Sequence, residues 1–92
     1  MKINNFKTLQ FAPIYTLLIT GANNRAVTQA DAQNVVSRIQ RATYLDGKGL
    51  QGGGYLVIIR TTFRNIQQIR NDVANVNHSV TVEAGYHYYH YH

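Results

Sequence analysis

Apolar and polar positions recur along this chain with two different periods, and the changes of period mark its elements. Residues 14–19 form a compact apolar run with β-branched and aromatic members, and the turn-forming residues Gly21, Asn23 and Asn24 follow it. This run predicts a first strand in a central position of a sheet. Residues 55–59 are apolar without interruption, which predicts a core strand that is buried on both faces.

Two stretches between and after these runs have the three- and four-residue spacing of amphipathic helices. The first predicted helix begins after Thr28 and extends to about Tyr44, and Asp31 stands where a carboxylate completes an N-terminal cap. The second predicted helix extends from about Phe63 to Val76, with Thr62 as its expected cap.

The remaining segments complete the expected fold. Alternation with a period of two from Ser79 onward predicts a long final strand. Residues 46–54 hold five glycines, and ordering them costs so much backbone entropy that we expect a mobile loop or the tip of a hairpin. The order strand-helix-strand-helix-strand predicts one α+β domain over residues 1–92 with a ferredoxin-like (split βαβ) arrangement. A simpler three-stranded arrangement is the alternative.

Composition limits the function classes. The 92 residues suffice for one core, and so small a core makes self-association a common supplement. The chain has no cysteine, which excludes disulfides and thiol nucleophiles and favours a cytoplasmic location. No apolar run is long enough to span a membrane. The net charge of +5 favours nucleic acid, nucleotides or an acidic protein as partner, although a small protein can carry this charge for solubility alone.

The segment 86–92 is unusual because it holds three of the four histidines and four of the seven tyrosines. Its histidines His87, His90 and His92 are candidate metal ligands, with the last two on one strand face. His90-Tyr91-His92 also resembles the histidine-hydrophobe-histidine motif of replication-initiator and relaxase nucleases, which binds a divalent ion. In those nucleases the motif lies on a central strand and a tyrosine nucleophile follows on a later helix, whereas here the three residues close the sequence.

A third interpretation of the segment is a stacking platform for nucleic-acid bases, in which arginines hold the phosphates. The candidate rings are Tyr86, Tyr88, Tyr89 and Tyr91. The candidate cations are Arg38, Arg41, Arg60, Arg64 and Arg70, together with Lys48 in the glycine-rich segment, where backbone N–H groups could also meet a phosphate.

A fourth interpretation is an aromatic strand that pairs with a second copy or with a partner protein. The four carboxylates form no catalytic pair, so we expect neither an enzyme nor a cofactor. The leading hypothesis is a small basic binding protein that acts by occupying a partner surface, such as a phage- or plasmid-type accessory or inhibitor protein, and that self-associates through strand edges. Nucleic-acid or nucleotide binding is the second hypothesis, and a metal- or histidine-dependent nuclease is the third.

Overall fold

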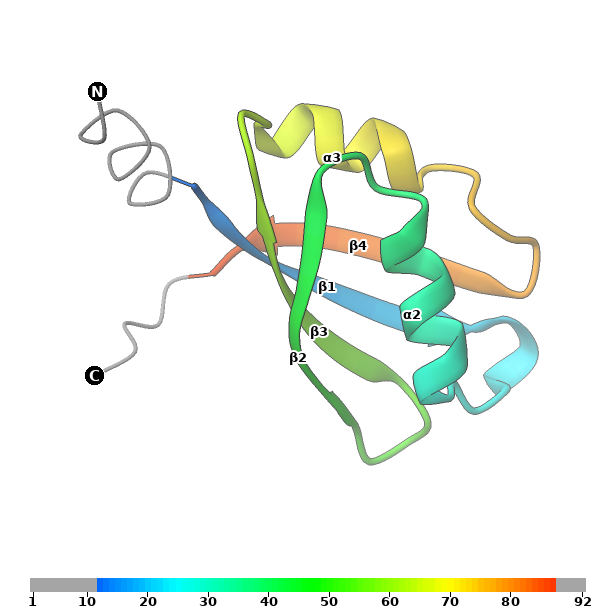
Figure 1. Cartoon of the computed structure of the whole chain (residues 1–92). Helices are drawn as coiled ribbons and strands as arrows, with labels where there is room; N and C mark the ends of the chain where they lie inside the picture. Colours follow the sequence, from blue (N-terminus) through cyan, green and yellow to red (C-terminus); the bar gives the residue numbers. More distant parts are fainter. Residues whose placement is uncertain (1–11, 88–92) are drawn as a thin grey trace, which may run out of the picture.

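The fold of residues 12–87, the part of the chain that the computed structural model describes, is built on a four-stranded antiparallel sheet. The strands lie in the order β2-β3-β1-β4. Along the chain the elements are β1 (Ile14–Gly21), the 3-10 turn η1 (Ala22–Asn24), α2 (Gln29–Ser37), β2 (Ala42–Gly49), β3 (Tyr55–Thr61), α3 (Ile66–Val73) and β4 (Val80–Tyr86) (Figure 1). The predicted α+β class and the central position of β1 are confirmed.

Two strand-helix-strand units interleave in this sheet. The unit β1-α2-β2 encloses β3, and the unit β3-α3-β4 encloses β1. This order is loosely compatible with the ferredoxin-like arrangement, which it does not confirm. The interleaving leaves β2 and β4 as the two edge strands.

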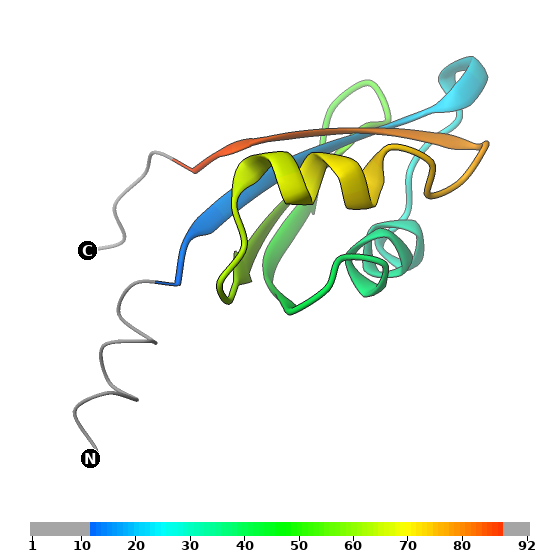
Figure 2. The same ribbon diagram turned by 90° about the horizontal axis from the view of Figure 1, so that it is seen from above.

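Both helices pack on one face of the sheet, and the core lies between them and that face (Figure 2). Alternate strand residues point into it: Leu17 and Ile19 from β1 and Val57 and Ile59 from β3 are completely buried. Leu56 and Ile58 point the other way and are half-buried, so the prediction that β3 is buried on both faces was wrong. We call the uncovered side the open face. Its positions are Ile14, Thr16, Leu18, Thr20, Thr43, Asp46, Lys48, Leu56, Ile58, Arg60, Thr81, Glu83 and Gly85.

Helix α2 begins where the sequence predicts and ends earlier. The Thr28 hydroxyl accepts the Asp31 N–H at 3.2 Å, and the Asp31 carboxylate accepts the Thr28 N–H at 2.9 Å. This backbone bond, followed by the bond from the Arg25 guanidinium, lowers the pKa of Asp31. The helix stops at Ser37 rather than near Tyr44 because Arg41 adopts a φ of 63° and the chain then joins β3 as β2.

The glycine-rich segment is more ordered than its composition predicts. Gly47 and Gly49 belong to β2, and only the turn after them is irregular, with φ values of 98° at Gly52 and 102° at Gly53. The predicted hairpin is therefore confirmed, and the predicted loop over 46–49 was wrong. A Cβ on Gly47 would overlap the Tyr44 hydroxyl and lie 2.9 Å from the Tyr55 ring, so this glycine leaves room for aromatic packing between β2 and β3.

Helix α3 is shorter than predicted at both ends. Its cap is Asn65 rather than Thr62: the Asn65 side chain accepts the Gln68 N–H at 2.9 Å, and the Gln68 side chain accepts the Asn65 N–H at 2.8 Å. Phe63 precedes the helix with a φ of 58° and is 71% exposed, so it does not join the apolar helix face. No helix within residues 12–87 combines the length and apolar character needed to cross a membrane.

Candidate functional site

The five arginines predicted to form a phosphate-binding surface have different structural roles. Arg64 lies in the loop before α3, where its Nη2 is 2.6 Å from the Asp72 carboxylate and its Nη1 is 3.1 Å from the Gln40 side-chain oxygen. The side chains of Arg64 and Asp72 are only 10% and 20% exposed. Arg64 is therefore an internal clamp between the end of α2 and helix α3.

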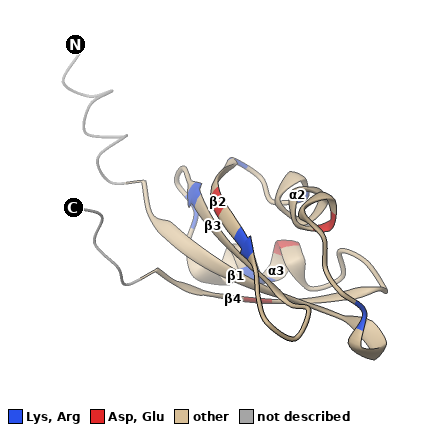
Figure 3. Ribbon diagram, turned by 90° about the horizontal axis from the view of Figure 1, so that it is seen from below, with Lys and Arg blue, Asp and Glu red and all other residues tan. Residues whose placement is uncertain are grey.

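The other cations point in separate directions. Arg38 caps the end of α2 and Arg41 lies in the turn before β2. Arg60 and Lys48 lie on the open face, and Arg70 lies on α3. In Figure 3 the basic positions are spread over several elements with acidic positions among them. The described residues thus provide no single basic surface, and Lys48 sits in a strand rather than in a phosphate-binding loop.

The predicted aromatic platform lies mostly outside the described residues, which exclude Tyr88, Tyr89, His90, Tyr91 and His92. Tyr86 is described and lies on the helix side of the sheet, where its ring centroid is 5.7 Å from that of Tyr15. Burial, followed by the neighbouring Tyr86, raises the pKa of Tyr15. His87 is half-buried just after β4. Residues 12–87 contain no group of three His, Asp or Glu side chains placed to hold a metal ion.

A tyrosine pair on β2 and β3 was not foreseen from the sequence. Tyr44 and Tyr55 pack over Gly47, because a Cβ built on this glycine would meet the side chains of both tyrosines. Partial burial, with a further contribution from the Tyr55 hydroxyl, raises the pKa of Tyr44 to about 12. The Tyr44 phenol therefore stays protonated at neutral pH, and the pair serves packing rather than nucleophilic chemistry.

The outer edge of β4 carries backbone groups that no described residue occupies. The β1–β4 ladder is flanked by bonds from His87 N–H to the Ile14 carbonyl and from Ala22 N–H to the Ser79 carbonyl. Because bonding direction alternates along an antiparallel strand, odd-numbered residues of β4 bond to β1 and even-numbered residues face away. The N–H and C=O of Val82 and the N–H of Ala84 therefore point out from the sheet.

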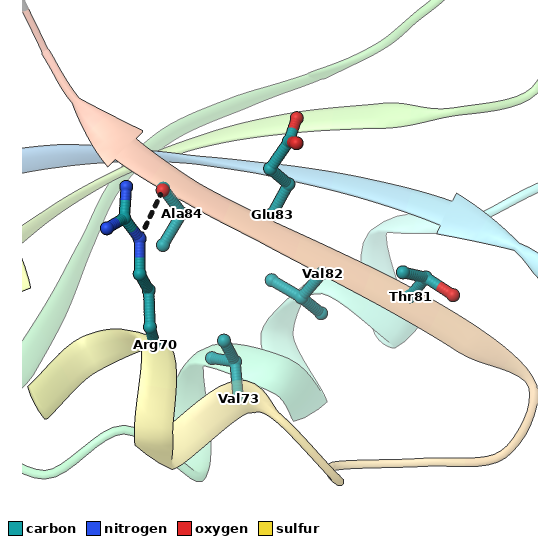
Figure 4. A pocket seen from close by; sticks show the side chains of 6 residues that line it. All are labelled: Arg70, Val73, Thr81, Val82, Glu83 and Ala84. Carbon is teal, nitrogen blue, oxygen red and sulfur yellow. Dashed lines mark hydrogen bonds between the residues drawn. The ribbon is translucent and has the colours of Figure 1, made fainter. Parts of the chain in front are cut away.

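A groove runs beside this edge, between α3 and β4. Its lining residues are Arg70, Val73, Thr81, Val82, Glu83 and Ala84, and its volume is about 410 Å³ (Figure 4). Val73 and Val82 give it an apolar floor. The Nε of Arg70 donates to the Ala84 carbonyl at 3.3 Å, which closes one end of the free edge. The terminal amino groups of Arg70 form no hydrogen bond to any described residue, so they can donate to a ligand.

The opposite edge of the sheet is protected. Strand β2 has a bulge between Tyr44 and Asp46, and the Asp46 carboxylate accepts the adjacent Gly47 N–H at 2.8 Å. A bulge and a charged residue both discourage pairing with a further strand. The register of β4 against β1 is continuous, without a bulge. Of the two edges of the described sheet, the β4 edge is the one without a bulge.

The sequence could supply only part of this site. The alternation after Ser79 places Val82 and Ala84 on the core side of a strand, as the structure confirms. It does not show that β4 is an edge strand, since strand order depends on the packing of distant segments. Arg70 was a candidate cation, but its position beside a strand edge was not predictable. Comparisons with family models, curated proteins and solved structures found no match.

Proposed function

We propose that this protein is a non-enzymatic binding protein that captures an extended segment of a partner protein along its β4 edge. The observation that carries the proposal is the run of free backbone groups at Val82 and Ala84 beside an apolar groove. Addition of a strand to an exposed sheet edge takes affinity from main-chain hydrogen bonds and specificity from pockets for alternate side chains.

The lining of the groove indicates the chemistry of the segment. A strand that pairs with Val82 would direct one apolar side chain against Val73 and Val82. The next groups along it would approach the guanidinium of Arg70, whose terminal amino groups suit a carboxylate. The partner segment is therefore extended, apolar in its centre and acidic, or a chain terminus, at the Arg70 end.

The described residues favour protein over nucleic acid as partner. Among residues 12–87 the open face carries no aromatic ring on which a base could stack, because Tyr15, Tyr44, Tyr55 and Tyr86 lie on the helix side. Two of the five arginines donate hydrogen bonds within the molecule in ways that fix them to α3 and β4. A protein that covers a partner's strand in this way would act as an inhibitor or accessory factor.

The ferredoxin-like arrangement is part of the same proposal. The interleaved strand-helix-strand units, with both helices on one face, support it. Such an arrangement leaves edge strands free for pairing.

The proposal is tested by selecting, from a library of short random peptides, those that bind the immobilised full chain. Their affinities are then compared between the wild type and variants of the β4 edge. Val82→Pro removes the outward N–H without removing a bond to β1, and edge strands tolerate proline at such positions. We expect selected peptides to bind this variant about tenfold more weakly, since a proline costs a main-chain bond and crowds the pairing strand. Circular dichroism and thermal unfolding check that the variant is folded.

Arg70→Met is the second variant, and Arg38→Met is its matched control, because it makes the same charge change away from the groove. Loss of binding of acidic peptides in the first variant but not in the second is the expected result. The proposal would be contradicted if the selected peptides bound the wild type and Val82→Pro with equal affinity. It would also be contradicted if no peptide were enriched on the wild type relative to Val82→Pro.

A further inference from the structure

The open face of the sheet carries an apolar strip that no described helix covers. Ile14 and Leu18 of β1 lie beside Leu56 and Ile58 of β3 in its centre, and all four are half-buried. Both helices lie on the other side (Figure 2). Apolar side chains in such a central strip favour packing against a second surface of similar shape.

Strand register places a charged residue at each end of one row across this face. Lys48 is opposite Leu56, Leu56 is opposite Leu18, and Leu18 is opposite Glu83. The row therefore reads cation, leucine, leucine, carboxylate from the β2 edge to the β4 edge. Within one molecule these two charges are about 14 Å apart, three strand spacings, which is too far for a direct ion pair.

We infer that a second copy of this chain covers the open face, in a two-fold symmetric dimer whose axis runs along the strands between β1 and β3. That axis reverses the order of the strands, so it places Lys48 of each copy over Glu83 of the other. The two leucines of each row then meet those of the partner. The same pattern serves both copies, as an isologous interface requires.

The neighbouring row is compatible with this packing. It reads Asp46, Ile58, Thr16, Gly85, so the symmetry places the Asp46 carboxylate over a glycine of the other copy. A Cβ at Gly85 would contact only the Thr16 hydroxyl, at 3.6 Å, which shows that the surface there is open. Packed sheets are rotated by about 30°, which shifts an edge residue by roughly 4 Å, within the reach of a lysine side chain.

The size of the face sets the expected affinity. Four strands and about seven residues correspond to roughly 19 Å by 23 Å, which is small for a protein interface. We therefore expect reversible dimerisation with a Kd on the order of micromolar. The two β4 edges lie on opposite sides of this dimer and stay open, so the inference is independent of the proposed peptide binding.

Sedimentation equilibrium of the full chain, over a concentration range of about 1 to 300 μM, tests the inference against charge reversals. Lys48→Glu and Glu83→Lys each replace two attractions with two repulsions and should weaken the dimer about tenfold or more. The double variant restores both pairs and should return the Kd to within about threefold of wild type. Arg38→Glu makes the same charge change as Lys48→Glu outside the face and should have little effect.

The outcomes separate this dimer from the alternatives. Val82→Pro should leave the dimer intact, whereas a dimer formed through the β4 edges would be lost. A chain that stays monomeric over the whole range would overturn the inference. A dimer that ignores both single reversals, or one that the double variant does not restore, would also overturn it.

Discussion

Replacement of Arg64 by methionine should destabilise the fold, because this arginine joins two helices from a position shielded from water. Its guanidinium donates to the Asp72 carboxylate at 2.6 Å, to the Gln40 side-chain oxygen at 3.1 Å and to the Gln68 carbonyl at 3.2 Å. The Tyr15 hydroxyl donates to the Arg64 carbonyl at 3.1 Å, which anchors the same loop to β1. Methionine keeps the aliphatic length and removes all three guanidinium bonds.

The magnitude follows from these contacts. Hydrogen bonds to charged groups contribute about 1.5–3 kcal/mol each when shielded, and partial exposure reduces this. After the substitution the Asp72 carboxylate, whose side chain is 20% exposed in the wild type, keeps only the Gln40 N–H, at 3.2 Å, and loses its cation. We expect a loss of about 2–3 kcal/mol in the free energy of unfolding, which lowers Tm by roughly 15 °C in a domain of this size.

Urea denaturation and thermal unfolding measure the effect. Arg38→Met and Arg60→Met are matched controls at exposed positions, where we expect changes within about 0.5 kcal/mol. A double-mutant cycle of Arg64→Met with Asp72→Asn should give a coupling energy of about 1–2 kcal/mol. If Arg64→Met is as stable as the two controls, Arg64 does not act as a structural clamp. It would then again be a candidate for ligand binding.

Three further substitutions test local features of the fold. Since the capping bonds lower the pKa of Asp31, its contribution to stability is present above the unfolded-state pKa and is lost as pH falls through the folded one. Asp31→Asn should therefore cost about 1 kcal/mol at pH 7 and progressively less in acid, as urea titrations at several pH values would show; an equal loss at all pH values would contradict this. Gly47→Ala should destabilise by about 1–3 kcal/mol because its Cβ would lie 2.9 Å from the Tyr55 ring, whereas Gly49→Ala, with its nearest contact at 4.0 Å, should be mild. Thr61→Val should stabilise by about 1 kcal/mol, since the completely buried Thr61 hydroxyl has no hydrogen-bond partner among residues 12–87; a lower Tm would count against that assignment.

Local patterns predicted strands β1, β3 and β4 and the start of helix α2. The apolar run from residue 14 and the alternation after Ser79 gave β1 and β4, and the cap formed by Thr28 and Asp31 gave the start of α2. Each of these signals depends on neighbours within about one helical turn or on strand alternation. The structure therefore confirms them with little change.

The sequence failed where distant segments decide the outcome. Residues 42–44 continue the helical spacing of α2, yet pairing with β3 draws them into β2, and the left-handed φ of Arg41 makes the break. Gly47 is tolerated in that strand because a Cβ there would overlap the Tyr44 hydroxyl and lie 2.9 Å from the Tyr55 ring. The role of Arg64 as a clamp depends in the same way on its bond to Asp72, which lies eight residues later in helix α3. No rule of sequence spacing predicts this pair.

The central claim is that the outer edge of β4 is free to bind a partner segment. Amide hydrogen exchange of the isotope-labelled chain tests this claim most directly. The amides of Val82 and Ala84 should exchange quickly in the free protein, because they point away from β1, while those of Thr81 and Glu83 are protected. A saturating selected peptide should slow exchange at Val82 and Ala84 specifically. Protection of these two amides in the free chain, or peptide-induced protection confined to other strands, would contradict the claim that the β4 edge binds the partner.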